Sequence, residues 1–487
     1  MIRFLRSLMG GRQTEALPSR YLDTPLLMVS PEDSLSIGDL CEGTAVFGGT
    51  GSGKTSGSGK ALSECLLSSG FGGLVLTAKP DERQLWEGYA RASGREDQLL
   101  VISPENPYRF NFLDYALNRP GVGAGLSGNI VSLFMQVMEV AEKDRGGKDE
   151  SYWQRTTRQL LRNSIDLLAL ARGRITLQEI YDIIISAPMS PEAIHDANWQ
   201  SNSLCFHCLA EAKERDHELP PERSRDLSLT ASYFLEEFPA LAEKTRSVIV
   251  SSFTSMADGF LRYPLRELFC TDTTIVPELA EEGMIILLDL PVKEYEEIGR
   301  FAQVLFKLLF QQSMERRTVK EDTPPVFLWA DEAHYFVTES DILFQTTARS
   351  SRVCTVYLTQ NRGNLESTFG GQNAKAQADA LLGSLLLKVW HANDHVDTNT
   401  WASETIGRTV QFRASSGAST SQGQPGGNSV NTGLAEQIEF QVTPHRFTTL
   451  RTGGPRNDLV VDALMFKQGR IWVTSDANYL PVSFRQG

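Results

Sequence analysis

A glycine-rich segment near the N-terminus has the residue types and spacing of a phosphate-binding loop. The pattern G-x-x-x-x-G-K-[ST] is matched in full by Gly48, Gly49, Thr50, Gly51, Ser52, Gly53, Lys54 and Thr55. Glycines let successive backbone N–H groups turn toward an anion, the lysine reaches the β- and γ-phosphates, and the threonine hydroxyl is a ligand for Mg²⁺. The segment lies between a predicted strand, residues 44–47, and a predicted helix, which is the context that such a loop requires. The sequence therefore predicts a site for ATP and Mg²⁺.

A pair of acidic residues much later in the chain has the residue types that a phosphate-binding loop needs beside it. Residues 326–330 form an apolar run typical of a buried strand, and Asp331 and Glu332 follow it directly. Phosphoryl transfer needs one carboxylate for the metal and another that orients water, at the end of a neighbouring strand. We expect Asp331 to hold Mg²⁺ through water and Glu332 to accept the proton of the attacking water. The weaker alternative is that the pair only caps the following helix.

Three further polar residues are candidates for the same site. Gln360 follows the predicted strand 355–359, where its amide could contact the γ-phosphate or the attacking water, or could simply bond to loop backbone. Arg349 and Arg352 precede that strand, and one of them could reach the nucleotide of a neighbouring subunit as an arginine finger. For either arginine singly, a solvated helix face is an equally good interpretation.

A mostly parallel sheet must position these residues. Apolar runs of strand type alternate with helical segments early in the chain and again late, whereas helical spacing dominates from 121 to 270. The predicted fold class is therefore α/β: residues 1–120 and 271–487 form one P-loop nucleotide-binding domain, and residues 121–270 form an all-helical insertion. Residues 413–433, rich in Ser, Gly and Gln, are expected to form a mobile loop.

Composition limits the binding partners and the compartment. Lys and Arg total 47 against 60 Asp and Glu, a net charge of −13, so general coating of nucleic acid is excluded and any DNA contact must be local. The six cysteines in 487 residues show no regular spacing of the kind found in disulfide frameworks, which fits a reducing compartment. No apolar stretch is long enough to cross a bilayer. We expect a cytoplasmic protein without membrane helices of its own.

One pair of cysteines resembles half of a zinc site. Cys205 and Cys208 form a single Cys-x-x-Cys, with His195 and His217 nearby, but the surrounding sequence is helical. Two thiols on a packed helix is the better interpretation, and a metal site is the alternative.

With these motifs in place, the chain resembles the TraG/TraD family of type IV coupling proteins, within the FtsK/HerA group of RecA-like ATPases. The resemblance spans roughly residues 37–464 and includes residues 109–115, which look like the family's R-x-N-P-L-D-Y segment. It implies a RecA-like core and a Mg²⁺-dependent ATPase that translocates DNA as a hexameric ring. It also implies that Arg349 is the finger acting on the neighbouring subunit and that Gln360 senses the γ-phosphate.

The chain departs from the family pattern at three places. Family members usually begin with transmembrane helices, and none is present in this sequence, so docking through its own membrane helices is not expected. Residues 77–82 read Thr-Ala-Lys-Pro-Asp-Glu where the family tends to have Asp-Pro-Lys-Gly-Glu, and Phe112 replaces the family's proline.

The resemblance implies a role in conjugative DNA transfer through type IV secretion. The expected partners are DNA, bound without sequence preference, further copies of the chain, and relaxosome or secretion-channel proteins, with a cytoplasmic location that extends to the inner-membrane surface. Two alternatives stay open. One is a soluble relative that drives a nuclease or other effector in an antiviral defence complex, and the other is a scaffold in which ATP orders a ring without translocation.

Overall fold

A nine-stranded, mostly parallel sheet forms the centre of the molecule, in a computed structural model that describes residues 22–143, 150–420 and 428–486. The strand order is β13-β12-β9-β3-β8-β7-β4-β6-β5. All pairings from β9 to β5 are parallel, and β12 pairs antiparallel with both β9 and β13. The strands are β3 (Thr44–Phe47), β4 (Gly72–Leu76), β5 (Leu99–Ile102), β6 (Ile285–Leu288), β7 (Val326–Ala330), β8 (Val353–Thr359), β9 (Leu387–Trp390), β12 (Val460–Lys467) and β13 (Tyr479–Arg485). The predicted α/β class is confirmed.

Both faces of this sheet are covered, which is why its strands are continuous apolar runs. Along β7 the side chains alternate between two separate cores: Val326 and Leu328 belong to one, Phe327 and Trp329 to the other. The first core is covered by α15 (Val292–Arg316), and the second by α3 (Lys60–Ser68) and α4 (Glu82–Ala92). Smaller elements complete the body: β1 (Pro25–Met28), β2 (Ser34–Ser36), α2 (Ile37–Cys41), α16 (Glu339–Ala348), α17 (Arg362–Phe369), α18 (Ala374–Ser384), α19 (Val396–Ile406) and α20 (Pro444–Thr448).

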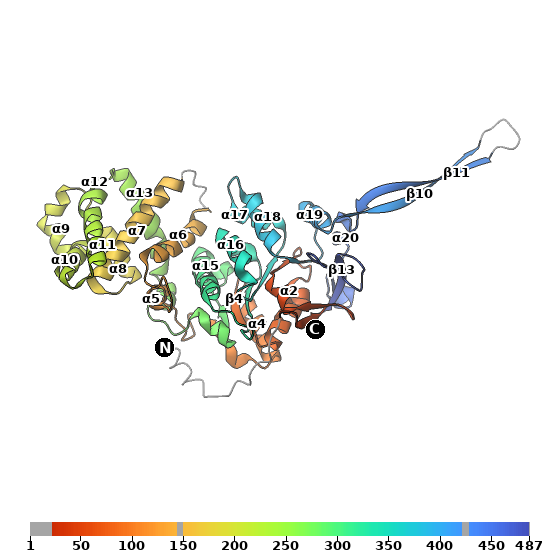
Figure 1. The fold of residues 1–487 in the computed structure, drawn as a ribbon, viewed down its shortest axis with the longest axis horizontal. Coiled ribbons are helices and arrows are strands. Elements are labelled where there is room, and N and C mark those ends of the chain that lie inside the picture. Colours follow the sequence, from red (N-terminus) through yellow and green to blue (C-terminus); the bar gives the residue numbers. More distant parts are fainter. Residues whose placement is uncertain (1–21, 144–149, 421–427, 487) are drawn as a thin grey trace.

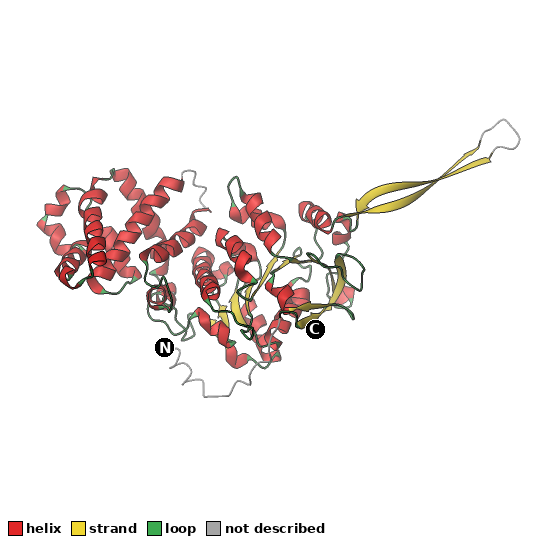
Figure 2. Cartoon of the chain, in the orientation of Figure 1, coloured by secondary structure: helices red, strands yellow, loops and turns green. Residues whose placement is uncertain are grey.

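A helical lobe lies at one end of the body, between β5 and β6 in the sequence (Figures 1 and 2). Its two connections run side by side, because Phe110 and Thr273 form an isolated antiparallel bridge. The chain therefore leaves the sheet for the helical lobe before residue 121. The division into residues 1–120, 121–270 and 271–487 remains our proposal for the domains. Its α-helices are α5 (Phe112–Asn118), α6 (Ser127–Lys143), α7 (Glu150–Arg172), α8 (Leu177–Ser186), α9 (Ala197–Asn202), α10 (Leu204–Glu214), α11 (Pro221–Ser232), α12 (Phe238–Ala240), α13 (Glu243–Phe260) and α14 (Leu265–Phe269).

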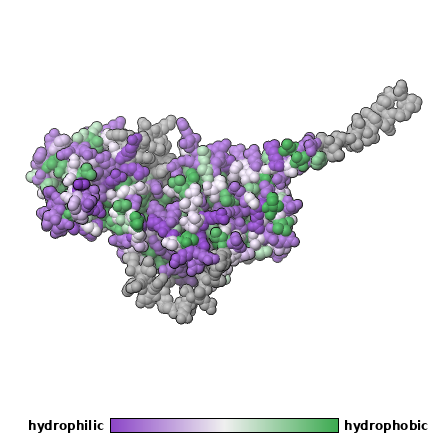
Figure 3. Space-filling view, viewed as in Figure 1, coloured by the Kyte–Doolittle hydropathy of each residue, from purple (hydrophilic) through white to green (hydrophobic). Residues whose placement is uncertain are grey.

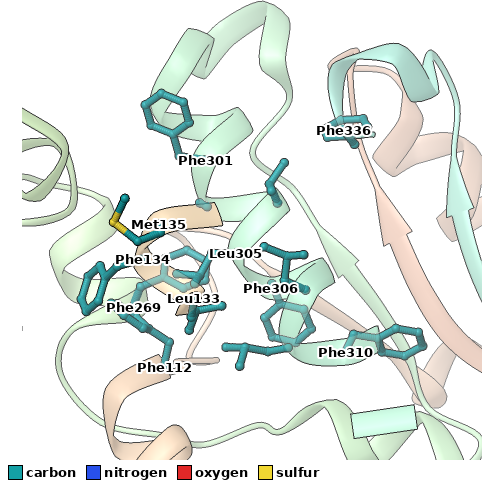
Figure 4. Packing of buried hydrophobic residues seen from close by; sticks show 14 of the residues in the cluster. Phe112, Leu133, Phe134, Met135, Phe269, Phe301, Leu305, Phe306, Phe310 and Phe336 are labelled. Carbon is teal, nitrogen blue, oxygen red and sulfur yellow. The ribbon is translucent and has the colours of Figure 1, made fainter. Parts of the chain in front are cut away.

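The lobe is joined to the body through a continuous apolar core. Phe112 and Phe134 of the lobe lie beside Leu305 and Phe306 of α15 (Figure 4). The rings of Phe112 and Phe134 meet edge to face with centroids 5.6 Å apart. Such buried aromatic contacts hold two packed units together by area and by ring geometry. No helix of the described ranges has both the length and the apolar character needed to cross a membrane.

The segment predicted as a mobile loop is a long β-hairpin in the described residues, so that prediction is wrong there. The strands β10 (Arg408–Thr420) and β11 (Asn428–Phe440) pair antiparallel from Arg408 opposite Phe440 to Thr420 opposite Asn428. The hairpin projects from the body beside α19 and α20 (Figure 1). Residues 421–427 of the predicted loop lie outside the described residues. The composition argument counted buried side chains, whereas two paired strands satisfy their backbone groups without any burial.

The side chains at the base of the hairpin belong to neither of the two cores of the body. Neither core contains a described residue of the hairpin, and at its base Val410, Phe412 and Ile438 are 49%, 67% and 70% exposed. Hydrophobic residues are visible where the hairpin leaves the body (Figure 3). The two cores of the body are therefore formed without the side chains at the base of the hairpin.

We expect the body to keep its stability when the outer part of the hairpin is removed. Phe412 and Glu436 are register partners, so an Asn-Gly turn can join them in place of residues 413–435. The free energy of unfolding should stay within about 0.5 kcal/mol of the full chain, because the base of the hairpin contributes no side chain to either core. Urea unfolding of both chains measures this, and a loss above about 1 kcal/mol would show that the hairpin stabilises the body.

Candidate nucleotide site

The predicted phosphate loop lies between β3 and α3. Gly51 and Gly53 have φ angles of +73° and +82°, the left-handed region that favours glycine. At Gly53 a Cβ would also lie 2.6 Å from a methyl carbon of Val461 on β12. After the loop, Thr55–Gly59 forms one wide helical turn that leads into α3. The glycines are thus required both for the curvature of the loop and for its close packing against β12.

Two oxygen ligands suited to Mg²⁺ lie together at the end of the loop. The Thr55 hydroxyl donates to Oδ2 of Asp331, with 2.8 Å between the oxygens. The other carboxylate oxygen of Asp331 accepts from the backbone N–H of Glu332 at 2.9 Å. Mg²⁺ in phosphate sites is bound by one or two such oxygen groups together with substrate phosphates and water. The residues present therefore fit the metal that the sequence predicts.

Glu332 lies beside this pair, and several donor groups approach one of its carboxylate oxygens. Its Oε1 is 3.3 Å from Nζ of Lys54, 3.3 Å from Nζ of Lys79 and 3.4 Å from Nε2 of Gln360. Its Oε2 is buried and has no hydrogen-bond donor among the residues that the structure describes. The backbone of Glu332 has a φ of +51°, a strained value for a residue with a side chain.

The electrostatics of the site keep both the acid and the lysine charged. Burial alone would raise the pKa of Glu332, but the ammonium groups of Lys54 and Lys79 and the hydrogen bond from Gln360 outweigh it and hold this pKa below its ordinary value. Burial likewise opposes the charge of Lys79, yet Asp331 and Glu332 raise the pKa of Lys79 above its ordinary value. Near neutral pH, Glu332 is therefore a carboxylate, the form that can accept a proton.

A cavity of about 530 Å³ opens in front of these groups. Besides the phosphate loop, its wall contains Leu85 and Tyr89 of α4 and Gln486, which follows β13. Gln486 donates from Nε2 to the Ser56 hydroxyl at 2.6 Å. The volume lies within the range of about 300–1,000 Å³ that is usual for small-molecule sites. A polar phosphate end and a partly apolar side wall are what a nucleotide requires.

Gln360 lies at the cavity, as the sequence predicts. It follows β8, which is the neighbour of both β3 and β7 in the sheet, so its side chain comes between the phosphate loop and the acidic pair. Its side-chain amide bonds to Glu332 rather than to loop backbone, while the backbone carbonyl of Gln360 accepts from Nδ2 of Asn393 at 2.7 Å. This placement favours the catalytic interpretation over the loop interpretation.

Comparison with known proteins assigns a family to this chain. The profile of the family described as "Type IV secretory system Conjugative DNA transfer" matches residues 19–453. The chain belongs to that family. This confirms the resemblance to type IV coupling proteins. No curated protein matches the chain significantly.

Solved structures of the conjugative coupling protein TrwB share the fold of this family member. Unbound TrwB is 15% identical, with a TM-score of 0.58 over 96% of this chain and 90% of that one. TrwB with a non-hydrolysable ATP analogue is 14% identical, with a TM-score of 0.57 over 98% of this chain and 96% of that one. TrwB with ADP and Mg²⁺ is 15% identical, with a TM-score of 0.57 over 98% and 92%. At this level of identity the likeness concerns the RecA-like fold.

The two candidate finger residues of this conjugative-transfer family member have different surroundings. The side chain of Arg349 is 61% exposed, pairs with Glu42 at 3.0 Å and lies outside the residues that line the cavity. Arg352 is buried, and its Nη1 donates to the backbone carbonyls of Glu321 at 2.9 Å and Thr323 at 2.6 Å. Arg352 thus holds a loop in place, which leaves Arg349 as the candidate for the finger.

The cysteine pair of this family member lies inside the helical lobe. Cys205 and Cys208 are both fully buried on α10. In the described part of the chain no three His, Cys, Asp or Glu residues are grouped as metal ligands. Burial raises the pKa of Cys208 to about 11, so it stays a thiol. This burial on α10 favours the interpretation as two thiols on a packed helix.

Six residues of the cavity were not predicted: Ser56, Lys60, Lys79, Leu85, Tyr89 and Gln486. Lys79 lies three residues after the end of β4, in the segment that departs from the family pattern, and a lysine so close to the end of a buried strand was a usable signal. Leu85 and Tyr89 follow the ordinary apolar spacing of α4, which carries no sign of a ligand. Gln486 stands at the far end of the sequence, and nothing local connects it to the phosphate loop.

Proposed function

We propose that this protein is a Mg²⁺-dependent ATPase that moves DNA through a ring of identical subunits during conjugative transfer. The observation that carries the proposal is the single cavity that joins the phosphate loop with Glu332 and Gln360, in a chain of the conjugative DNA transfer family. TrwB, which shares the fold, has been solved with an ATP analogue and with ADP and Mg²⁺. ATP and Mg²⁺ are accordingly the proposed ligands of this chain.

The chemistry assigned to the site is the hydrolysis of the β–γ phosphoanhydride. Backbone N–H groups of the loop and the ammonium of Lys54 hold the phosphates, and Thr55 and Asp331 hold the metal. Bound Mg²⁺ supplies positive charge to the phosphate oxygens. A water oxygen bonds to the γ-phosphorus, the bond to the bridging oxygen breaks, and its electron pair leaves on ADP. Oε2 of Glu332 takes the proton of the water, while Gln360 orients the water or the γ-phosphate.

The ring part of the proposal is supported by the position of Arg349. An exposed arginine outside its own cavity suits a residue that acts on the nucleotide of a neighbour, and a finger in trans requires adjacent subunits. All six cysteines are free thiols, as suits the cytoplasmic side of a secretion channel. Relaxosome and secretion-channel proteins are the proposed partners there.

We expect Arg349→Ala to spare nucleotide binding and to lower kcat by about 10³-fold or more, because an arginine finger acts on the charge of the transition state. Arg91→Ala is a matched control, since Arg91 is an exposed arginine paired with Glu96 at 2.7 Å. Mixing Arg349→Ala subunits with Lys54→Ala subunits should restore part of the turnover, because each supplies the group that the other lacks. If Arg349→Ala kept the wild-type kcat and mixing the two variants changed no turnover, Arg349 would not be the finger.

Turnover of ATP with and without DNA tests the proposed function. A motor should hydrolyse ATP faster when single- or double-stranded DNA is added, and the stimulation should fall as salt rises, since the contacts are to phosphates. Electron microscopy with a non-hydrolysable ATP analogue should show a ring around DNA. Turnover that ignores DNA, with a ring that assembles on ATP alone, would indicate a scaffold instead.

A further inference from the structure

Lys79 is a second lysine at the acidic pair, and it comes from a different strand than Lys54. It follows β4, which lies next to β7 in the sheet, and its side chain is part of the cavity wall. Its Nζ is 3.3 Å from Oε1 of Glu332 and 3.8 Å from Oδ2 of Asp331. With its side chain 38% exposed, Lys79 reaches both carboxylates from the open side of the cavity.

The backbone that presents Lys79 is fixed by buried hydrogen bonds on both sides. The N–H of Thr77 donates to Oε1 of Gln303 at 2.7 Å, and Nε2 of Gln303 donates back to the Thr77 carbonyl at 2.9 Å. The N–H of Ala78 donates to Oε2 of Glu82 at 2.9 Å. These bonds come from α15 and α4, so the turn is held from two directions. A lysine on such a turn is anchored at its Cα, and only its own side chain moves.

The donors on Glu332 are unevenly distributed between its two oxygens. Lys54, Lys79 and Gln360 all approach Oε1. Oε2 accepts no hydrogen bond from the described residues and lies 3.7 Å from Nδ1 of His334. A carboxylate held by one oxygen leaves the other to accept a proton. Lys54 also belongs to the phosphate loop, so a bound triphosphate competes with Glu332 for its ammonium group. When Lys54 turns to the phosphates, Lys79 is the cation that stays on Oε1.

We propose that Lys79 is a positioning residue that holds Oε1 of Glu332 while ATP is bound, so that Oε2 keeps the orientation in which it accepts the proton of the attacking water. The inference rests on the proposed function, in which Glu332 is the base. A base must lie within hydrogen-bond reach of the proton that it removes, and small displacements lower the rate strongly. Without Lys79, Oε1 of Glu332 would keep the amide of Gln360 as its partner once Lys54 had moved.

Replacement of Lys79 by Met should therefore lower kcat about tenfold or more and leave the dissociation constants for ADP and for a non-hydrolysable ATP analogue within about threefold. Lys79→Arg, which keeps the charge, should recover a substantial part of the turnover. Lys375→Met is the matched control, because Lys375 is exposed on α18 and lies outside the residues that line the cavity; its kcat should match the wild type. Should Lys79→Met fail to fold, Lys79→Gln carries the same expectation.

A double variant separates positioning from a general loss of structure. If Lys79 acts through Glu332, then adding Lys79→Met to Glu332→Gln should lower the single-turnover rate no further. An additive loss would overturn the inference, and so would a kcat of Lys79→Met within twofold of the wild type. A defect that disappears at saturating ATP would also overturn it, since Lys79 would then be a phosphate ligand.

The same measurements distinguish this inference from the proposed function. Wild-type turnover and its loss in Glu332→Gln concern the base alone and are measured first. If both behave as expected while Lys79→Met stays active, only the role of Lys79 is refuted. If the wild type hydrolyses no ATP with or without DNA, the proposed function and the inference both fail.

Discussion

Glu332→Gln is expected to lower ATP turnover by roughly 10²- to 10⁴-fold while nucleotide binding persists, because this range is what a general base contributes. Glutamine has the same shape but cannot take a proton from water. The change also removes the carboxylate that competes with phosphates for Lys54, which lies 3.3 Å from Oε1 in the present structure. Binding of the triphosphate should therefore be at least as tight as in the wild type. Phosphate release and the binding of a fluorescent ATP analogue measure the two effects.

Two further variants serve as a control and a comparison for this prediction. Glu64→Gln makes the same chemical change on α3, where Glu64 pairs only loosely with Lys60 at 3.8 Å, and its turnover should match the wild type. Asp331→Asn should instead weaken binding in a Mg²⁺-dependent way, because Asp331 faces the Thr55 hydroxyl. If Glu332→Gln kept more than a tenth of the wild-type kcat, another group would have to be the base.

The second large expected effect concerns stability: Lys307→Met should cost about 3–5 kcal/mol of the free energy of unfolding. Lys307 of α15 and Asp341 of α16 form an ion pair in which both side chains are fully buried. Asp341 also accepts from Tyr357 at 2.7 Å and from Gln311 at 2.7 Å. Removing the lysine leaves a buried carboxylate with dipoles but no counter-ion, which is the costly case. Urea unfolding monitored by tryptophan fluorescence measures the loss.

The cause can be separated from simple loss of packing. Adding Asp341→Asn to Lys307→Met removes the uncompensated charge and keeps an oxygen acceptor, so the double variant should regain most of the stability. Lys375→Met, at an exposed position on α18, should stay within about 0.5 kcal/mol of the wild type. A Lys307→Met variant that lost less than about 1 kcal/mol would contradict the electrostatic account.

The strands could be predicted because strands that are covered on both faces are continuous apolar runs in the sequence. β7 covers the same residues, 326–330, as the predicted apolar run. No local sequence pattern indicates the ion pair of Lys307 and Asp341, because a lysine in a helix is ordinarily solvated and its burial depends on the elements that pack against it. The hairpin escaped prediction because its pairing depends on backbone bonds, for which Ser- and Gly-rich composition gives no signal.

The candidate site was predictable only where its chemistry is local. Lys54, Thr55, Asp331 and Glu332 belong to short patterns, and the rule that parallel strands end at one edge brings them together. Lys79 joins them because β4 is the neighbour of β7, and no pattern in the sequence states that order. Gln486 depends on still more distant geometry, the antiparallel pair of β12 and β13 beside the loop.

The strand order also dictates when the site can exist during synthesis. β3, which leads into the phosphate loop, pairs only with β8 and β9, and Phe47 lies opposite Thr359. At ~5–20 residues per second, a ribosome needs roughly 15 to 60 s to reach the partner strand after the first one has emerged. Until then β3 is an unpaired apolar segment with open edges, the kind that chaperones cover. The nascent chain can therefore bind no nucleotide through a finished site until some three quarters of it has been made.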